Sequence, residues 1–187
     1  MSVNTKNNPT PLHPYTLTPK MNTFITLCQS RRSIRQYTNQ PVEREKLERL
    51  LQCALMSPSG KRINPWQFWV LTNEAQLRPL AQCKTYGSGM FSTAMAGIVV
   101  AVDASLTDTW AYDGAIAAEH LLLAAADEGL GACWCQIAGR EESERLVREV
   151  AGIPDHLTVI CVISLGYKNE ERKNYDLSKL PYEKVHY

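Results

Sequence analysis

The chain has 187 residues, which is enough for one domain with a hydrophobic core. Its composition, 44% hydrophobic and 21% charged residues, is ordinary for a globular protein that folds in water. The formal net charge of +1 gives no overall field that would attract nucleic acid or an anionic membrane. No apolar run is long enough to span a bilayer. We therefore expect neither nucleic acid nor a membrane among the partners of this protein.

The cysteines indicate a reducing compartment. No set of cysteines and histidines has the spacing of zinc ligands, so we predict no metal site. The N-terminus is polar and lacks a secretory signal, and the cysteines therefore predict buried thiols in the cytoplasm. Cys133 and Cys135 flank Trp134 and face the same way on a predicted strand; packing is the favoured interpretation and a redox role the alternative. The six cysteines are Cys28, Cys53, Cys83, Cys133, Cys135 and Cys161.

The first part of the chain differs in composition from the rest. Residues 1–20 contain prolines at four positions and few large apolar side chains. This composition is typical of an extended or disordered arm. We therefore predict an N-terminal arm over residues 1–20 and one folded domain over residues 21–187.

Hydrophobic periodicity and turn residues predict alternating helices and strands. Two polar loops are expected, over residues 57–66 and 166–179. In chain order, the pattern predicts a helix over Phe24–Gln29, a helix over Val42–Met56, a strand over Gln67–Leu71, a helix over Glu74–Lys84, a strand over Gly97–Val102, a helix over Thr109–Glu128, a strand over Ala132–Ile137, a helix over Glu141–Val150, a strand over Leu157–Leu165 and a short terminal strand over Pro181–Tyr187.

Two of these segments suggest how the elements pack. The helix over Thr109–Glu128 is apolar nearly all round, which is typical of a helix in the middle of a structure or an assembly. The strand over Gly97–Val102 is continuously apolar and should be buried on both faces. The order of the elements predicts an α+β or α/β fold with helices on a mixed sheet.

Several familiar catalytic motifs are absent from the sequence. No G-x-G-x-x-G follows a strand, and neither a Walker A motif nor a G-x-S-x-G elbow is present. No obvious nucleophile or acid–base pair stands out. If the protein is an enzyme, a bound cofactor is therefore expected to carry its chemistry.

The most informative short motif is Arg31-Arg32-Ser33-Ile34-Arg35. In an extended backbone, Arg31, Ser33 and Arg35 point to the same side. Guanidinium forks and a hydroxyl that converge on one point suit a phosphate group. The alternative is a solvated basic turn that binds nothing.

Taken together, four stretches resemble the nitroreductase family of FMN-dependent oxidoreductases. One of them contains Pro58-Ser59-Gly60 and Pro65-Trp66, and is similar to the P-S-x-x-N-x-Q-P-W segment of the family. The matches follow the order of the family from about Phe24 to Tyr187. The four stretches are Arg31–Arg35 with Tyr37, Pro58–Phe68, Asp113–Trp134 and Gly152–Tyr167.

This resemblance implies a fold, an assembly and a cofactor. The expected fold is a three-layer α/β/α arrangement with a mixed, mostly antiparallel sheet. The expected assembly is an intertwined homodimer that exchanges C-terminal strands and holds two FMN sites at its interface. The implied activity passes hydride from NAD(P)H through flavin N5 to an electron-poor small-molecule acceptor, such as a nitroaromatic or a quinone. The alternatives are a flavin-binding or storage protein without reductase turnover, and a reductive dehalogenase or flavin-processing relative.

The resemblance also implies roles for particular residues. Arg31, Ser33 and Arg32 would hold the phosphate and ribityl chain of FMN, and Arg35 would reach the pyrimidine edge of the flavin. Either of two residues in the polar loop after the last strand would add a second phosphate contact. The remaining implied contacts are Pro58, Ser59 and Gly60 from the partner subunit, a backbone N–H of Ile137, Ala138 or Gly139 to flavin N5, and Arg172 or Lys173 at the phosphate.

The chain departs from the family pattern at four positions. Arg62 stands where the family usually has Asn, and Asn64 where it has Gln; both are candidate flavin contacts. Glu119 and His120 stand where the long helix often reads Gln-Asn. These departures bear on the substrate preference and the flavin potential more than on flavin binding.

Overall fold

The computed structural model describes residues 24–187, so the arm expected over residues 1–20 lies outside the described residues. Its centre is a sheet with the strand order β1-β2-β4-β3. The strands are β1 Trp66–Leu71, β2 Ala96–Val102, β3 Gly131–Gln136 and β4 Thr158–Gly166. Each neighbouring pair of strands is antiparallel. The sheet is thus more uniformly antiparallel than the mixed sheet we expected, and the one parallel pairing in residues 24–187 is an isolated bridge between Ser33 and Ala132.

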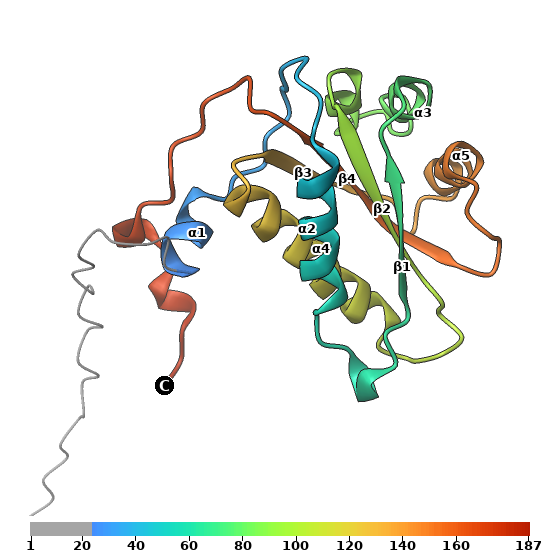
Figure 1. Cartoon of the computed structure of the whole chain (residues 1–187). Coiled ribbons are helices and arrows are strands. Elements are labelled where there is room, and N and C mark those ends of the chain that lie inside the picture. The colour runs from blue at the N-terminus through green and yellow to red at the C-terminus, as the bar shows by residue number, and fades with distance from the viewer. Residues whose placement is uncertain (1–23) are drawn as a thin grey trace, which may run out of the picture.

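Helices cover both faces of the sheet and make the three layers that were expected (Figure 1). The helices α2 Arg44–Leu55 and α4 Trp110–Asp127 lie on one face. The helices α3 Glu74–Leu80 and α5 Glu141–Ala151 lie on the other face. A short helix, α1 Phe24–Ser30, lies beside the C-terminal segment. The 3-10 turns are η1 Gly60–Arg62, η2 Gly89–Ser92, η3 Leu177–Lys179 and η4 Tyr182–Lys184.

The alternation of side chains along β2 explains why both faces carry helices. Ile98, Val100 and Val102 belong to the cluster under α2 and α4, whereas Val99 and Ala101 belong to the cluster under α3 and α5. All seven residues of β2 are buried, as the continuous apolar run predicted. The strand is therefore the centre of two cores at once.

The helix α4 packs closely on the sheet because it has a glycine at the contact. A Cβ added at Gly114 would meet the Ile160 Cγ1 at 2.8 Å and the Val102 Cγ1 at 3.0 Å. The apolar residues of α4 therefore pack, at least in part, against α2 and the sheet.

No helix in the described residues is both long and apolar enough to cross a membrane.

The segment after α1 is attached to the sheet edge at β3. The Ile34 N–H donates to the Ala132 carbonyl at 2.9 Å, and the buried Tyr37 hydroxyl donates to the Ile34 carbonyl at 2.5 Å. Two glycines make room for this segment. A Cβ at Gly131 would meet the Ile34 Cγ2 at 2.7 Å, and a Cβ at Gly166 would meet the Tyr37 ring at 2.9 Å.

Two predicted elements differ from the structure. The helix expected over Glu74–Lys84 ends at Leu80, directly after Pro79, whose ring is tolerated only near a helix end. The terminal strand expected over Pro181–Tyr187 is wrong for the single chain, because the segment forms the 3-10 turn η4 and is exposed. A strand needs a neighbouring strand to satisfy its backbone, and this chain offers none there. The exchange of this segment with a partner stays a prediction.

The Tyr37 hydroxyl provides a test of how strongly the segment holds to the sheet. It is also hydrogen-bonded to the Ser164 Oγ at 2.7 Å, and burial raises its pKa. Tyr37→Phe leaves the buried partners unsatisfied and is expected to lower the free energy of unfolding by about 1–3 kcal/mol. Urea unfolding followed by fluorescence measures the change. The matched control is Tyr182→Phe, which removes an exposed hydroxyl bonded to the Leu177 carbonyl; an equal effect of the two changes would contradict the assignment.

Candidate functional site

The structure brings Arg31, Ser33 and Arg35 to one region around the thiol of Cys133. Burial raises the pKa of Cys133, whereas the positive charges of Arg35 and Arg31 and a hydrogen bond with Ser33 oppose the rise. The intervening Ile34 is buried, and Arg35 is exposed. The alternating pattern predicted from the sequence thus places the two guanidinium groups and the hydroxyl near one another at the start of β3.

Arg32 has a different environment from its neighbours. Its guanidinium lies over the Tyr175 ring, 4.5 Å from the ring centre, and donates to the Lys173 carbonyl. The Tyr175 N–H in turn donates to the Gln29 carbonyl at 3.0 Å. Arg32 therefore connects the Arg31–Arg35 segment to the segment that follows β4.

The segment after β4 runs back along the residues that follow Arg35. The Thr38 N–H donates to the Tyr167 carbonyl and the Asn169 N–H to the Gln36 carbonyl, both at 2.9 Å. These bonds bring Arg172 and Lys173 to the same end of β3 as Arg31 and Arg35. Residues 168–173 line a hollow of about 840 Å³ beside the segment.

An acidic residue, Glu170, orders this hollow. Its carboxylate accepts the N–H groups of Arg35 and Gln36, and it forms an ion pair with Arg172 at 2.6 Å. Arg31 lies 3.9 Å from Glu119 of α4. Cationic side chains outnumber carboxylates around the hollow, so its net charge is positive. A positive hollow suits an anion such as a phosphate group. Sequence reasoning missed Glu170, because a carboxylate in a polar loop gives no pattern of its own.

The other end of β3 offers a backbone donor. A bulge in β4 turns the Ile160 carbonyl toward this end, where it accepts the N–H groups of Ile137 and Ala138, both at 3.1 Å. The Gly139 N–H has no acceptor within residues 24–187. Gly139 is exposed, with φ of +78°, a conformation that favours glycine. Of the three residues predicted to donate to a flavin, Gly139 is thus the one whose N–H is available.

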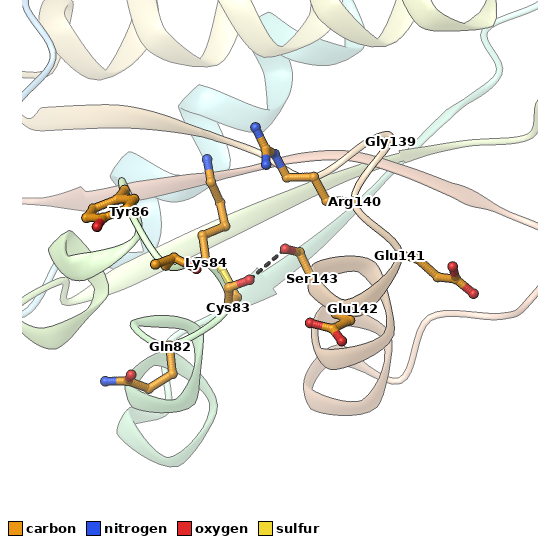
Figure 2. A pocket seen from close by; sticks show the side chains of 10 residues that line it. Gln82, Cys83, Lys84, Tyr86, Gly139, Arg140, Glu141, Glu142 and Ser143 are labelled. Carbon is orange, nitrogen blue, oxygen red and sulfur yellow. Dashed lines mark hydrogen bonds between the residues drawn. The ribbon is translucent and has the colours of Figure 1, made fainter.

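A second hollow, of about 750 Å³, adjoins Gly139 on the α3 and α5 face of the sheet. Figure 2 shows Lys84 and Arg140 extending to one side of it, while Glu141 and Glu142 point away from them. The hollow is lined by residues 82–86 and 139–143. Sequence reasoning missed it, because residues 82–86 and 139–143 are far apart in the chain.

The structure does not bring Pro58, Ser59, Gly60, Arg62 and Asn64 to these residues. They precede β1, at the sheet edge opposite β3. Figure 1 shows η1 far from α1, at the start of β1. With strands about 4.8 Å apart, the width of the sheet alone separates the two edges by roughly 14 Å.

The loop before β1 is nevertheless well defined. The Gly60 N–H donates to the buried Asp113 carboxylate at 2.9 Å, and a Cβ at Gly60 would meet the Thr109 Oγ1 at 2.4 Å. Arg62 and Asn64 have positive φ values of 59° and 52°, which are uncommon for residues other than glycine. Strained backbone of this kind often accompanies function. An aspartate in the first turn of an apolar helix was the signal in the sequence that could have identified the role of Asp113.

The ionised form of Glu170 should stabilise the folded chain in a pH-dependent way. Burial acts to raise its pKa, but the Arg35 N–H and the Arg172 guanidinium outweigh burial, and the pKa is lowered. A carboxyl whose pKa is lowered by folding adds stability above its unfolded pKa, about 4.3. That stability is lost as the pH falls through the lower, folded pKa.

Glu170→Gln should therefore be less stable than the parent protein at neutral pH, and the difference should shrink as the pH falls below about 4. Urea unfolding at a series of pH values measures it. Glu171→Gln is the matched control, because Glu171 is exposed and forms no hydrogen bond or ion pair within the described part of the chain. A difference that is independent of pH would show that the ionised carboxylate is not its source.

Comparison with known proteins identifies the family of the chain. The sequence profile of the nitroreductase family matches residues 28–87 and 103–167, more than half of the chain. A protein of Archaeoglobus fulgidus, named for NADH dehydrogenase and NAD(P)H nitroreductase activities, is 35% identical over 160 residues, which cover 83% of this chain and 91% of the relative.

Solved structures give the same result. The FMN-dependent nitroreductase of Clostridium difficile R20291 superposes with a TM-score of 0.85 and is 38% identical, covering 88% of this chain and 98% of that one. A Bacteroides fragilis nitroreductase solved with bound FMN has a TM-score of 0.68 at 20% identity, covers 86% of this chain and 98% of that one, and shows the fold alone. The chain therefore belongs to the nitroreductase family of oxidoreductases.

Proposed function

We propose that the protein binds FMN along the edge strand β3 and uses it to oxidise NAD(P)H. The observation that carries this proposal is the pair of features at the two ends of β3. Arg31, Ser33 and Arg35 lie at its start, and the available Gly139 N–H lies just beyond its end. Cations suit the phosphate of FMN, and a backbone N–H suits a ring nitrogen of the flavin.

The residues present fit this cofactor in their chemistry. The hollow is lined in part by Arg172 and Lys173, either of which can donate to the phosphate in addition to Arg31, Ser33 and Arg35. The Ile160 carbonyl accepts the N–H groups of Ile137 and Ala138, and these hydrogen bonds fix the backbone directly before Gly139. When bound, FMN accepts a hydride from NAD(P)H and delivers electrons to an electron-poor acceptor such as a nitroaromatic or a quinone. The protein holds the cofactor and places cations near its edge.

We infer that a second copy of the chain completes each site. The loop with Pro58, Ser59 and Gly60 lies at the sheet edge opposite β3, so it cannot reach the β3 edge of its own chain. The exposed C-terminal segment, residues 181–187, has no strand partner within the described residues and is available to a neighbouring molecule. A homodimer of this kind would place the loop of one copy against the β3 edge of the other.

Arg31→Ala tests cofactor binding and activity together. A hydrogen bond to a charged group contributes about 1.5–3 kcal/mol, so FMN should bind at least about tenfold more weakly. Fluorescence titration of the apoprotein with FMN measures the affinity. Arg145→Ala on α5 is the control, because the Arg145 side chain is exposed and has no hydrogen bond or ion pair in residues 24–187.

Steady-state oxidation of NAD(P)H, with and without a nitroaromatic or quinone acceptor, separates the alternatives. Turnover that depends on the acceptor supports the reductase. Tight FMN binding without turnover would instead support a flavin-storage protein, and turnover only with halogenated or flavin substrates would support the other relatives. Purified protein that takes up no FMN would contradict the proposal as a whole.

Mixed dimers test whether each site is shared between copies. Ser59→Trp should block the loop side of the site, and Arg31→Ala should weaken the β3 side. In a dimer of one Arg31→Ala chain and one Ser59→Trp chain, one site carries both changes and the other carries neither. Differently tagged chains, co-expressed and purified through both tags, should therefore recover about half of the parent activity. No recovery would place both halves of the site in one chain.

A further inference from the structure

Two cationic side chains in the hollow beside Gly139 have no role in the proposed function. Lys84 lies in the turn after α3, Arg140 directly follows Gly139, and both line the hollow. Lys84 is half-buried and Arg140 is exposed, and neither side chain forms a hydrogen bond or an ion pair within residues 24–187. Figure 2 shows both extending to the same side of the hollow. This side therefore presents two positive charges without an ion-pair partner in the described part of the chain.

Hydrogen bonds hold the two walls of the hollow in place. The Lys84 N–H donates to the buried Ser88 Oγ at 3.3 Å, which fixes the turn after α3. The Ser143 Oγ of α5 donates to the Cys83 carbonyl at 2.6 Å, as the dashed line in Figure 2 shows. This bond joins the turn after α3 to the start of α5. The two walls are therefore held together by the chain itself.

The backbone of Arg140 is fixed in the same way. Its N–H donates to the Ile137 carbonyl at 3.0 Å, and its carbonyl accepts the Glu144 N–H at 2.9 Å. Ordering of flexible groups costs free energy when a ligand binds. Because the backbone is already ordered, a ligand that binds the guanidinium group needs to order only the side chain.

Two carboxylates also line the hollow but lie apart from the cations. Figure 2 shows Glu141 and Glu142 pointing away from Lys84 and Arg140. Both acids are in the first turn of α5, where the positive end of the helix dipole favours negative charge. The helix itself therefore accounts for the two carboxylates, and the side of the hollow with the two cations is positive.

We propose that Lys84 and Arg140 form an anion subsite, which holds the carboxylate or phosphate of an aromatic substrate whose ring reacts at the flavin. A planar guanidinium binds two oxygens of such a group at once, and an ammonium adds a compact charge. A hollow of about 750 Å³ has the size of a small-molecule site, and the exposed Tyr86 in its wall offers an aromatic face to a ring. The inference rests on the proposed function, because Gly139, which is assigned to the flavin there, lines the same hollow.

Two substrates of the proposed reaction can supply this chemistry. One is an electron-poor aromatic acceptor that carries a carboxylate. The other is NAD(P)H, whose nicotinamide ring is linked to phosphates. Both have an anionic group on the same molecule as the ring that exchanges electrons with the flavin. The two cases differ in which substrate loses affinity when a cation is removed from the hollow.

Isothermal titration calorimetry of the flavin-loaded protein measures the subsite without turnover. The probes are 3-phenylpropanoate for the acceptor and nicotinamide mononucleotide for NAD(P)H. Lys84→Gln removes a hydrogen bond to a charged group and should weaken one of the two probes about tenfold. Lys84→Arg keeps the charge and should retain most of the affinity. Weaker 3-phenylpropanoate binding assigns the subsite to the acceptor, and weaker nicotinamide mononucleotide binding assigns it to NAD(P)H. Unchanged affinity for both probes would overturn the proposal.

Steady-state kinetics separate the subsite from the reductase activity itself. The acceptors are 3-(4-nitrophenyl)propanoate and its uncharged amide, in which methylene groups insulate the nitro group from the difference in charge. Arg140→Gln should lower the ratio of the two kcat/KM values about tenfold if the acceptor supplies the anion, and kcat/KM for NAD(P)H about tenfold if the nucleotide does. Absence of turnover in the parent protein contradicts the proposed function. Turnover in which neither quantity changes contradicts the subsite alone.

Arg145→Gln is the matched control, because it removes the same charge from α5 and Arg145 does not line the hollow. It should leave both calorimetric affinities unchanged. An effect equal to that of Lys84→Gln would show a general effect of charge and would refute the subsite. Lys84 and Arg140 belong to separate segments, so a variant that fails to fold at one position leaves the other position as a test.

Discussion

The attachment of the Arg31–Tyr37 segment to the β3 edge is the constraint on which the site depends. One buried hydroxyl, that of Tyr37, bonds to the segment itself through Ile34 and to the sheet through Ser164. Two glycines are needed opposite it, because a Cβ at either would overlap with Ile34 or Tyr37. Arg35 is exposed and Arg31 is half-buried, while Ile34 between them is buried against the sheet.

The same constraint sets the position of the segment after β4. Once Arg35 and Gln36 lie along the edge, their N–H groups face the Glu170 carboxylate. Glu170 in turn pairs with Arg172. A carboxylate in an anion site lowers the local positive charge, but it also fixes the cations in one arrangement. Glu170 therefore links the backbone of Arg35 and Gln36 to the guanidinium of Arg172 in one network.

Much of this fold could be predicted, because burial leaves a periodic pattern in the sequence. The helix expected over Val42–Met56 corresponds to α2, and the strand expected over Gly97–Val102 corresponds to β2, each within a residue or two. Strand direction could not be predicted in this way, because an apolar run looks the same in parallel and antiparallel sheets. The segment over residues 181–187 is not a strand in the single chain, which offers it no neighbouring strand.

The site could be predicted only in part, because only its local motif leaves a pattern in the sequence. The Arg31–Arg35 motif is local, and its alternation could be interpreted from five residues. The role of Glu170 depends on contacts between distant segments, and no spacing in the sequence reports them. Cys135 illustrates the limit: it shares a face with Cys133, as expected, but its thiol lies 3.7 Å from the carbonyl of Gly87, a residue far from it in the sequence.

The loop before β1 shows how an incomplete site can be recognised within one chain. Asp113 and Thr109 hold Gly60, and Ser59 is hydrogen-bonded to Asn64. Arg62 is nonetheless exposed, with a left-handed backbone, and its side chain has no hydrogen bond or ion pair in residues 24–187. Holding a residue in that conformation costs free energy, and no contact of its side chain within residues 24–187 offsets the cost. A loop that is firmly supported from behind while its outward side chain has no partner is arranged for contact with another molecule. Because a guanidinium can only donate hydrogen bonds and keeps its charge, that molecule must present acceptors or negative charge to Arg62.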